Sequence, residues 1–114
     1  MKQENIPFFF HGILKGRYED EQDAELFGYE LFTRGFNTFK REDGASIKGT
    51  LAMVPVEEVP ELDMIEGFPS YYIRIQLPVV TDSGAIINAW VYQQAEDWIN
   101  DMEFKMLSEA MAYV

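Results

Sequence analysis

The sequence contains no cysteine, and this absence excludes several kinds of chemistry at once. Without thiols the chain can form no disulfide bond, use no cysteine nucleophile and supply no thiolate to a metal ion. Histidine is almost as scarce, because His11 is the only one in 114 residues. A zinc site would have to consist almost entirely of carboxylates, so we expect no structural metal.

Positive charge is also in short supply, since nine lysines and arginines face 20 acids and the formal net charge is −11. Such a charge repels phosphate backbones, so we expect no binding to nucleic acid. Five of the acids lie within residues 19–25, EDEQDAE. This segment is either a solvated, mobile loop that keeps the protein soluble, or a repulsive rim that selects cationic or neutral partners.

Long hydrophobic runs are absent as well. No apolar stretch approaches the roughly 18 residues of a membrane span, and the first residues, MKQENIP, lack the apolar segment of a signal peptide. The length is that of one domain. We therefore expect a single domain over residues 1–114 that is soluble, cytoplasmic and not bound to a membrane.

Core material, in contrast, is plentiful, with 47% hydrophobic and 15% aromatic residues. Six short stretches have the composition of β-strands, and the first, 7–14, is apolar enough to be buried on both faces. A polar connection follows at 15–25. An Asp-Gly pair predicts a tight hairpin turn over 41–44, and Asp82-Ser83-Gly84 predicts another. The remaining predicted strands are 27–32, 36–39, 47–54, 71–80 and 85–92.

Two segments have helical features. Pro60 near one end and Gly67 at the other predict a short helix over 58–66. In the C-terminal segment the apolar spacing changes to four, at Trp98, Met102 and Met106, joined by Ile99, Leu107 and Met111. This spacing predicts an amphipathic helix over 97–113. We interpret its stripe of methionine and aromatic residues as core contact. Together these elements predict an α+β domain whose strands close into a small mixed β-barrel with flanking helices.

Glu66 is the glutamate of the short helix that falls on its apolar side. At about 100° per residue it projects between Val59 and Leu62, whereas the neighbouring acids point elsewhere. Burial and the negative end of the helix both raise a carboxyl pKa, which suits a general base. The alternative is a structural glutamate that hydrogen-bonds a nearby amide or tyrosine and only holds the turn. Asp63, at the edge of the same stripe, is interpreted as a local cap or an ion-pair partner.

Five motifs follow one another in a recognisable order, within a similarity that runs over residues 7–93. This order resembles the gamma-glutamylcyclotransferase-like family, which includes the gamma-glutamylamine cyclotransferases. The LDxxEG element followed by a tyrosine and an arginine is the most specific part. The motifs are Phe10-His11-Gly12-Ile13-Leu14-Lys15-Gly16, Gly49-Thr50-Leu51, Leu62-Asp63-Met64-Ile65-Glu66-Gly67-Phe68-Pro69, Tyr72-x-Arg74 and Ala89-Trp90-Val91-Tyr92.

The resemblance implies a closed barrel with a cavity at one end and a small-molecule gamma-glutamyl substrate. Members of the family let the substrate's own α-amine attack its γ-carbonyl, which releases 5-oxoproline and a free amine without a metal or organic cofactor. A monomer or a homodimer is expected. Glu66 matches the catalytic glutamate, and the substrate-binding positions match the turn His11, Gly12, Ile13 and Leu14 and the cavity tyrosines Tyr72 and Tyr92.

Two positions depart from the family pattern. His11 stands where the family has tyrosine, and it either donates a hydrogen bond in that place or only fills the space. Ile13 replaces a threonine or serine, which removes a hydroxyl and makes the pocket more apolar. A turn that binds through main-chain amides tolerates both changes.

The sequence leaves two hypotheses from different classes. One is a cyclotransferase that acts on a gamma-glutamyl amine or amide, or that removes a protecting gamma-glutamyl group from a biosynthetic intermediate. The other is a binding module that holds a small ligand or partner in the same barrel without turnover. The presence of Glu66 favours the enzyme, and the changes at His11 and Ile13 favour the module.

Overall fold

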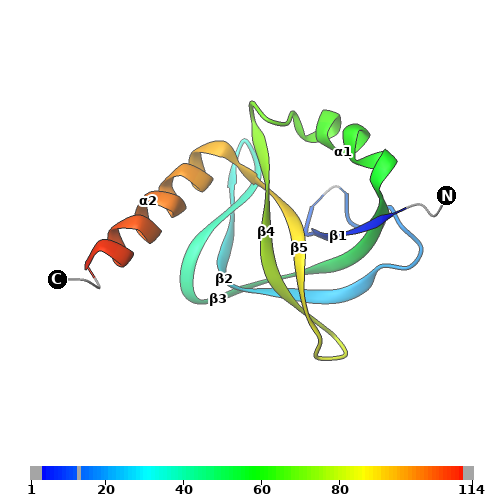
Figure 1. Cartoon of the computed structure of the whole chain (residues 1–114), viewed down its shortest axis with the longest axis horizontal. Coiled ribbons are helices and arrows are strands. Elements are labelled where there is room, and N and C mark those ends of the chain that lie inside the picture. The colour runs from blue at the N-terminus through cyan, green and yellow to red at the C-terminus, as the bar shows by residue number, and fades with distance from the viewer. Residues whose placement is uncertain (1–3, 13, 112–114) are drawn as a thin grey trace.

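Five β-strands close into a barrel in the order β1-β3-β2-β4-β5, and two helices lie outside it (Figure 1). Neighbouring strands pair antiparallel, except that β1 and β5 pair in parallel. The predicted α+β domain with a mixed closed barrel is therefore confirmed. The structure is a computed structural model that describes residues 4–12 and 14–111. The elements are β1 (Asn5–Phe10), β2 (Gln22–Arg34), β3 (Phe36–Pro55), the 3-10 turn η1 (Val56–Glu58), α1 (Val59–Glu66), β4 (Tyr72–Thr81), β5 (Ile86–Gln94) and α2 (Ala95–Met111).

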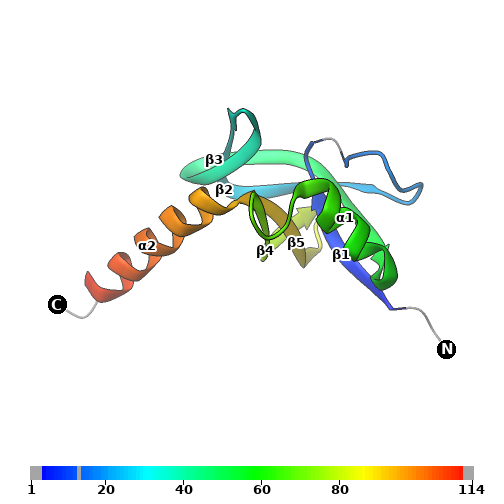
Figure 2. The same ribbon diagram turned by 90° about the horizontal axis from the view of Figure 1, so that it is seen from above.

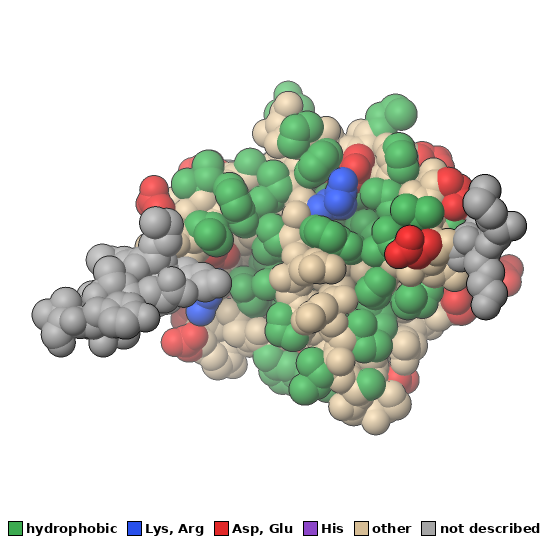
Figure 3. Space-filling view, in the orientation of Figure 1, with side chains coloured by type: hydrophobic (Ala, Val, Ile, Leu, Met, Phe, Trp, Pro, Cys, Tyr) green, Lys and Arg blue, Asp and Glu red, His purple; other side chains and the backbone are tan. Residues whose placement is uncertain are grey.

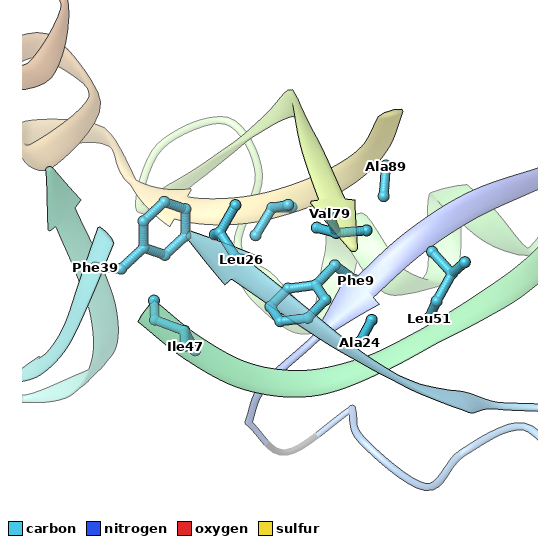
Figure 4. Close-up of a cluster of buried hydrophobic side chains, with 9 residues drawn as sticks. Phe9, Ala24, Leu26, Phe39, Ile47, Leu51, Val79 and Ala89 are labelled. Carbon is cyan, nitrogen blue, oxygen red and sulfur yellow. The ribbon is translucent and has the colours of Figure 1, made fainter. Parts of the chain in front are cut away.

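The buried side chains form two clusters on opposite faces of β1. Phe9 points into the barrel, where it meets residues from all five strands, among them Leu26 and Phe39 (Figure 4). Phe8 and Phe10 point the other way, because successive residues of a strand alternate between its faces. They pack in a second cluster with Leu62 of α1. The prediction of a first strand buried on both faces is confirmed, and the second cluster fixes α1 against the barrel wall.

The predicted hairpin turn over 41–44 is wrong. These residues lie inside the long strand β3, whose hairpin with β2 turns instead at Gly35. Tyr29 pairs with Arg41 whereas Phe27 pairs with Ser46, so the register shifts between them. Gly28 and Gly44 have φ values of 87° and 84° at this shift. The glycine of the Asp-Gly pair adopts its left-handed conformation in a β-bulge and not in a hairpin turn, and both strands continue beyond the bulge.

The polar connection after β1 is shorter than predicted, because β2 already begins at Gln22. β1 also ends earlier, at Phe10, and the chain then turns with a 3.0 Å hydrogen bond from the Lys15 amide to the Gly12 carbonyl. Gly49 of β3 passes so close to this end that a Cβ there would lie 2.3 Å from the Phe10 carbonyl oxygen. The end of the first strand therefore packs directly against a glycine of the neighbouring strand.

The short helix forms where it was predicted. α1 ends at Gly67, which has φ 70° and donates a 3.2 Å hydrogen bond to the Met64 carbonyl. Leu62 is fully buried, and Glu66 is half-buried as the helical spacing indicated. By its spacing Ile65 should continue the apolar stripe of this helix, but it is 43% exposed and does not extend the buried side.

α2 forms where it was predicted but leads away from the barrel (Figures 1 and 2). Its side chains Ile99 and Met102 are 48% and 38% exposed, so the interpretation of this stripe as core contact is wrong for these two residues. The predicted residues 112–113, and the side chains from 104 onward, lie outside what the structure describes. Among the described residues, no helix is both long enough and apolar enough to cross a membrane.

Polar contacts hold the first turns of α2 against β3 and β5. The buried Asp97 accepts a 2.9 Å hydrogen bond from the Thr38 hydroxyl. The side-chain amide of Gln93 donates hydrogen bonds to the Phe39 carbonyl and to the Asp101 carboxylate, each at 2.8 Å. Buried polar groups need such partners to avoid a desolvation cost, so this end of α2 has one defined position on the barrel. In the space-filling view, hydrophobic side chains cover much of the face above β4 and β5, and acidic side chains lie both within this face and at its edges (Figure 3).

Candidate active site

A cavity of about 700 Å³ opens at one end of the barrel, between the turn after β1, the β2–β3 turn and the end of α1. A volume of this size is typical of small-molecule sites. It brings together six of the seven predicted site residues, although they are far apart in the sequence. These six are His11, Gly12, Leu14, Glu66, Tyr72 and Tyr92, while Ile13 lies outside the described residues.

Sequence reasoning missed several other residues of the wall. Met64, Ile65 and Tyr71 lie beside Glu66 in the sequence, and their apolar character next to a half-buried acid could have indicated them. Thr33 and Asn37 come from the β2–β3 turn, and no local pattern points to them. The remaining lining residues are Phe9, Phe10, Gly35, Gly67 and Gln94.

Glu66 is the carboxylate of this wall. Its side chain is half-buried, and this burial raises its pKa. Within the described part of the chain no group donates a hydrogen bond to its carboxylate, so the structure offers no support there for a glutamate that merely ties down the turn. A desolvated carboxylate without a donor keeps its lone pairs available for a proton.

The two cavity tyrosines both donate their hydroxyl protons to the protein. Tyr72 donates to the main-chain carbonyl of Asn37 at 2.7 Å, and Tyr92 donates to the carboxylate of Asp63 at 2.6 Å. Burial raises the pKa of both phenols, and for Tyr92 the bond to Asp63 raises it further. The charge of Glu66 also raises the pKa of both tyrosines. They therefore stay protonated at neutral pH, and they lie within the electrostatic reach of Glu66.

Asp63 is an ion-pair partner, which confirms one of the two roles expected for it. Its two carboxylate oxygens accept hydrogen bonds from Nε and Nη2 of Arg74 at 2.7 and 3.0 Å. The guanidinium lies over the rings of Phe68 and Trp90, with its central carbon 4.6 and 5.5 Å from the ring centroids. This arrangement links the end of α1 to β4 and β5 beside the cavity.

His11 packs as an aromatic ring. Its centroid lies 6.2 Å from that of Phe9 and 5.7 Å from that of Phe39, the latter in an edge-to-face arrangement. Burial lowers its pKa to about 4, so the imidazole is neutral at pH 7. Its Nδ1 is buried and has no hydrogen-bond partner in the described part of the structure. His11 thus fills the aromatic position of the turn as an uncharged group.

The turn next to His11 carries main-chain amides that are free to bind. The N–H groups of Gly12 and Leu14 donate no hydrogen bond to any described residue. Main-chain N–H groups of a turn are good donors to a carboxylate or to a developing oxyanion. Both residues line the cavity that contains Glu66.

The acidic segment after this turn is partly built into the fold. Glu21 accepts hydrogen bonds from the amides of Gly16 and Tyr18 at 2.8 and 2.7 Å, and from the Thr50 hydroxyl at 2.5 Å. Burial alone would raise the pKa of Glu21, but these bonds outweigh it and the pKa is lowered. The interpretation of 19–25 as a solvated loop is therefore wrong for Glu21 and for residues 22–25, which belong to β2.

Contacts to η1 and α1 hold the same loop from the other side. Arg17 forms a 3.0 Å ion pair with Glu61, and the Tyr18 hydroxyl lies 3.3 Å from Glu58. The loop therefore connects two walls of the cavity. Over residues 4–12 and 14–111, no group of three or more histidine, aspartate and glutamate side chains is arranged to hold a metal ion.

Comparison with known proteins relates this chain to a protein family. The sequence model of the family described as "Gamma-glutamyl cyclotransferase, AIG2-like" matches residues 7–109. A curated protein of Methanocaldococcus jannaschii, provisionally named a gamma-glutamylcyclotransferase, is 34% identical over 53 residues. That match covers 46% of this chain and only 44% of the relative.

Solved structures share the fold at low sequence identity. A structure titled "Gamma-glutamyl cyclotransferase" superposes with a TM-score of 0.68 at 18% identity, over 81% of this chain and 68% of the other. A protein of Arabidopsis thaliana gives 0.67 at 18% identity, over 99% and 85% of the two chains. An AIG2-like protein of Mus musculus gives 0.63 at 19% identity, over 81% and 78%.

Proposed function

Since the chain belongs to the gamma-glutamyl cyclotransferase, AIG2-like family, we propose that it is a cyclotransferase acting on a gamma-glutamyl amine or amide. The products are 5-oxoproline and a free amine. The observation that carries the proposal is Glu66, a half-buried carboxylate of raised pKa in the cavity wall. It has no hydrogen-bond donor among the described residues.

The reaction is an intramolecular displacement that needs little from the protein. The α-amine nitrogen of the substrate attacks its own γ-carbonyl carbon and forms the new C–N bond of a five-membered ring. The old C–N bond then breaks, and its electron pair leaves with the departing nitrogen. No water is consumed. Folding the substrate so that its two ends meet supplies much of the rate, because the attack becomes unimolecular.

Glu66 acts as the proton carrier of both steps. It takes a proton from the attacking nitrogen and gives that proton to the leaving amine. Its raised pKa brings the carboxylate closer to the value at which it can both accept and return a proton near neutral pH. The tyrosines of the cavity are poor candidates for this role, since each has its proton bound to another protein group.

The turn after β1 stabilises the charge that develops on the γ-carbonyl oxygen. The N–H groups of Gly12 and Leu14 are the proposed donors, with Ile13 between them. Such preorganised donors act on the transition state in a site with little water. His11, Tyr72 and Tyr92 complete the substrate-binding wall.

A binding module without turnover remains the second candidate. It is favoured by His11, which is neutral and packed between phenylalanine rings where the family has tyrosine. Its partner would be a small molecule in the same cavity.

A panel of gamma-glutamyl amines and amino acids separates the two candidates, with 5-oxoproline measured by mass spectrometry and binding measured by calorimetry. We expect release by the wild-type protein and a loss of about 100-fold or more in Glu66→Gln, the low end of what one general base contributes. Glu57→Gln is the matched control, because it removes the same charge from an exposed position on η1. Binding without release would support the module and exclude the enzyme.

A further inference from the structure

One aspartate joins three elements around the cavity. Asp63 of α1 accepts two hydrogen bonds from Arg74 of β4 and one from Tyr92 of β5. Arg74 and Tyr92 are opposite each other in the antiparallel register of the two strands. Both side chains of this cross-strand pair therefore converge on the same carboxylate, which fixes the end of α1 over the β4–β5 ribbon.

The main chain of Asp63 fixes the turn that follows. Its carbonyl accepts a 2.9 Å hydrogen bond from the Phe68 amide, and the Phe68 ring in turn stacks on the Arg74 guanidinium. Glu66 lies between the two ends of this hydrogen bond, one helical turn after Asp63. Any shift of Asp63 relative to the barrel must therefore also shift Glu66.

We propose that Asp63 is a positioning residue for the cyclisation: it holds Glu66 and Tyr92 in place around the cavity, with Arg74 as its counter-ion. The inference rests on the proposed function for the reaction, but its geometric part can be tested without turnover. Asp63 is not a lining residue of the cavity, so its effect on the substrate passes through the two residues that it holds.

The direction of the Tyr92 hydrogen bond gives this arrangement a chemical consequence. The hydroxyl proton is bound to Asp63, so Tyr92 can present its oxygen to the cavity only as a hydrogen-bond acceptor. The substrate group that suits it is an N–H, either of the α-amine or of the leaving nitrogen. Because Asp63 binds the Tyr92 proton, Glu66 remains the group that carries the transferred proton.

Arg74 is suited to this task in a way that lysine is not. Its planar guanidinium binds both oxygens of Asp63 and stacks between two aromatic rings, whereas an ammonium could make only point contacts. We therefore expect Arg74→Lys to weaken the arrangement while keeping the charge.

The kinetic test uses Asp63→Asn, Tyr92→Phe and their combination. For Asp63→Asn we expect kcat to fall about 10- to 100-fold, as it does when the outer partner of a metal-ligating residue is removed, with KM changed far less. In the double variant the two losses should be less than multiplicative, because the uncharged amide oxygen at position 63 is a weaker acceptor and already loosens the bond to the Tyr92 hydroxyl. Glu57→Gln is the control: it removes one charge from an exposed position on η1, directly before the same helix, and should leave kcat unchanged.

Independent, multiplicative losses in the double variant, or an equal loss in Glu57→Gln, would overturn the proposal. If Asp63→Asn does not fold, Arg74→Lys serves as the second variant. It should lower kcat by a smaller factor while KM stays near the wild-type value. An unchanged kcat in a folded Arg74→Lys would count against the ion pair as a positioning device.

A second readout does not depend on turnover. The pKa of Glu66 can be measured by ¹³C NMR titration of its carboxyl carbon, with the signal identified by its loss in Glu66→Gln. Asp63→Asn combined with Arg74→Met removes both charges, so the net charge beside Glu66 is preserved while the connection is lost. We expect the Glu66 pKa to fall toward its ordinary value as the helix end opens to water.

An unchanged Glu66 pKa in that double variant would overturn the positioning role. Failure of the proposed function has a different signature, in which the wild-type protein turns over no gamma-glutamyl compound at all. The titration then still decides whether Asp63 positions Glu66.

Discussion

The hydroxyl of Tyr72 on β4 donates a 2.7 Å hydrogen bond to the main-chain carbonyl of Asn37, at the tip of the β2–β3 hairpin. The neighbouring Thr38 is held as well, by its hydrogen bonds with Asp97 and with the Gln94 amide. The bond from Tyr72 fixes the tip beside the cavity, whose wall includes Thr33 and Gly35. The Tyr72 hydroxyl thus helps to keep this side of the cavity in place.

Tyr72→Phe should therefore loosen the hairpin tip more than it destabilises the protein. Loss of one hydrogen bond to an exposed turn costs about 1 kcal/mol of unfolding free energy, because water can replace the donor. Amide hydrogen exchange around residues 33–37 should accelerate while the barrel strands stay protected. Equal acceleration throughout the barrel would contradict the local role of this bond.

Glu66→Gln should make the folded protein more stable at neutral pH. The pKa of Glu66 is raised by burial, so the folded state favours its protonated form and the carboxylate lowers stability above that pKa. The amide removes this penalty. The gain should disappear below about pH 4.5, where the glutamate is protonated in both states. Urea unfolding at pH 7 and pH 4 measures the difference, and destabilisation at pH 7 would indicate a structural role instead.

His11 should make the protein less stable in acid. Its pKa is about 4 in the folded state because of burial, against about 6.5 when unfolded, so the unfolded state binds more protons between these values. Stability should fall as the pH drops from about 6.5 to 4, by up to about 3 kcal/mol. Glu66 acts in the opposite direction over part of this range. The difference between His11→Phe and wild-type unfolding curves isolates the histidine, since phenylalanine fits the same aromatic neighbours.

Gly49→Ala should be strongly destabilising. An added methyl group would lie 2.3 Å from the Phe10 carbonyl oxygen and 2.7 Å from the Phe9 ring, and both belong to the buried first strand. We expect a cost of about 3 kcal/mol or more, at the upper end for overpacked cores. Gly12→Ala is the control, because its nearest neighbour would be 3.9 Å away. Similar melting temperatures for the two variants would contradict the close approach.

The sequence predicted those features that depend on neighbours along the chain. Three consecutive phenylalanines indicated a strand buried on both faces, and helical spacing placed Glu66 on the inner side of α1. The Asp-Gly pair at 43 and 44 misled because a hairpin turn and a bulge require the same left-handed glycine. Only the partner strand, with its own glycine at 28, decides between them.

Contacts between distant segments account for what could not be predicted. Asp63 meets Arg74 and Tyr92 only after β4 and β5 have paired, and the bond between Tyr72 and Asn37 requires the barrel to be closed. Glu21 belongs to a run of acids that looked solvated, yet Thr50 on another strand is one of its donors. No local pattern carries such information.

Closure of the ring by β1 and β5 also has a consequence for biosynthesis. Phe8 pairs with Trp90, so the ring is completed by the first and the last of the barrel's own strands to leave the ribosome. β3 can cover one edge of β1 soon after it emerges, but the other edge must wait for β5. A growing chain therefore carries an apolar strand with an open edge through most of its translation, which is the period when such strands associate with other chains. Slow codons placed before β5 would lengthen the time for which β1 is exposed. A chaperone bound to β1 would prevent its association with other chains during that time.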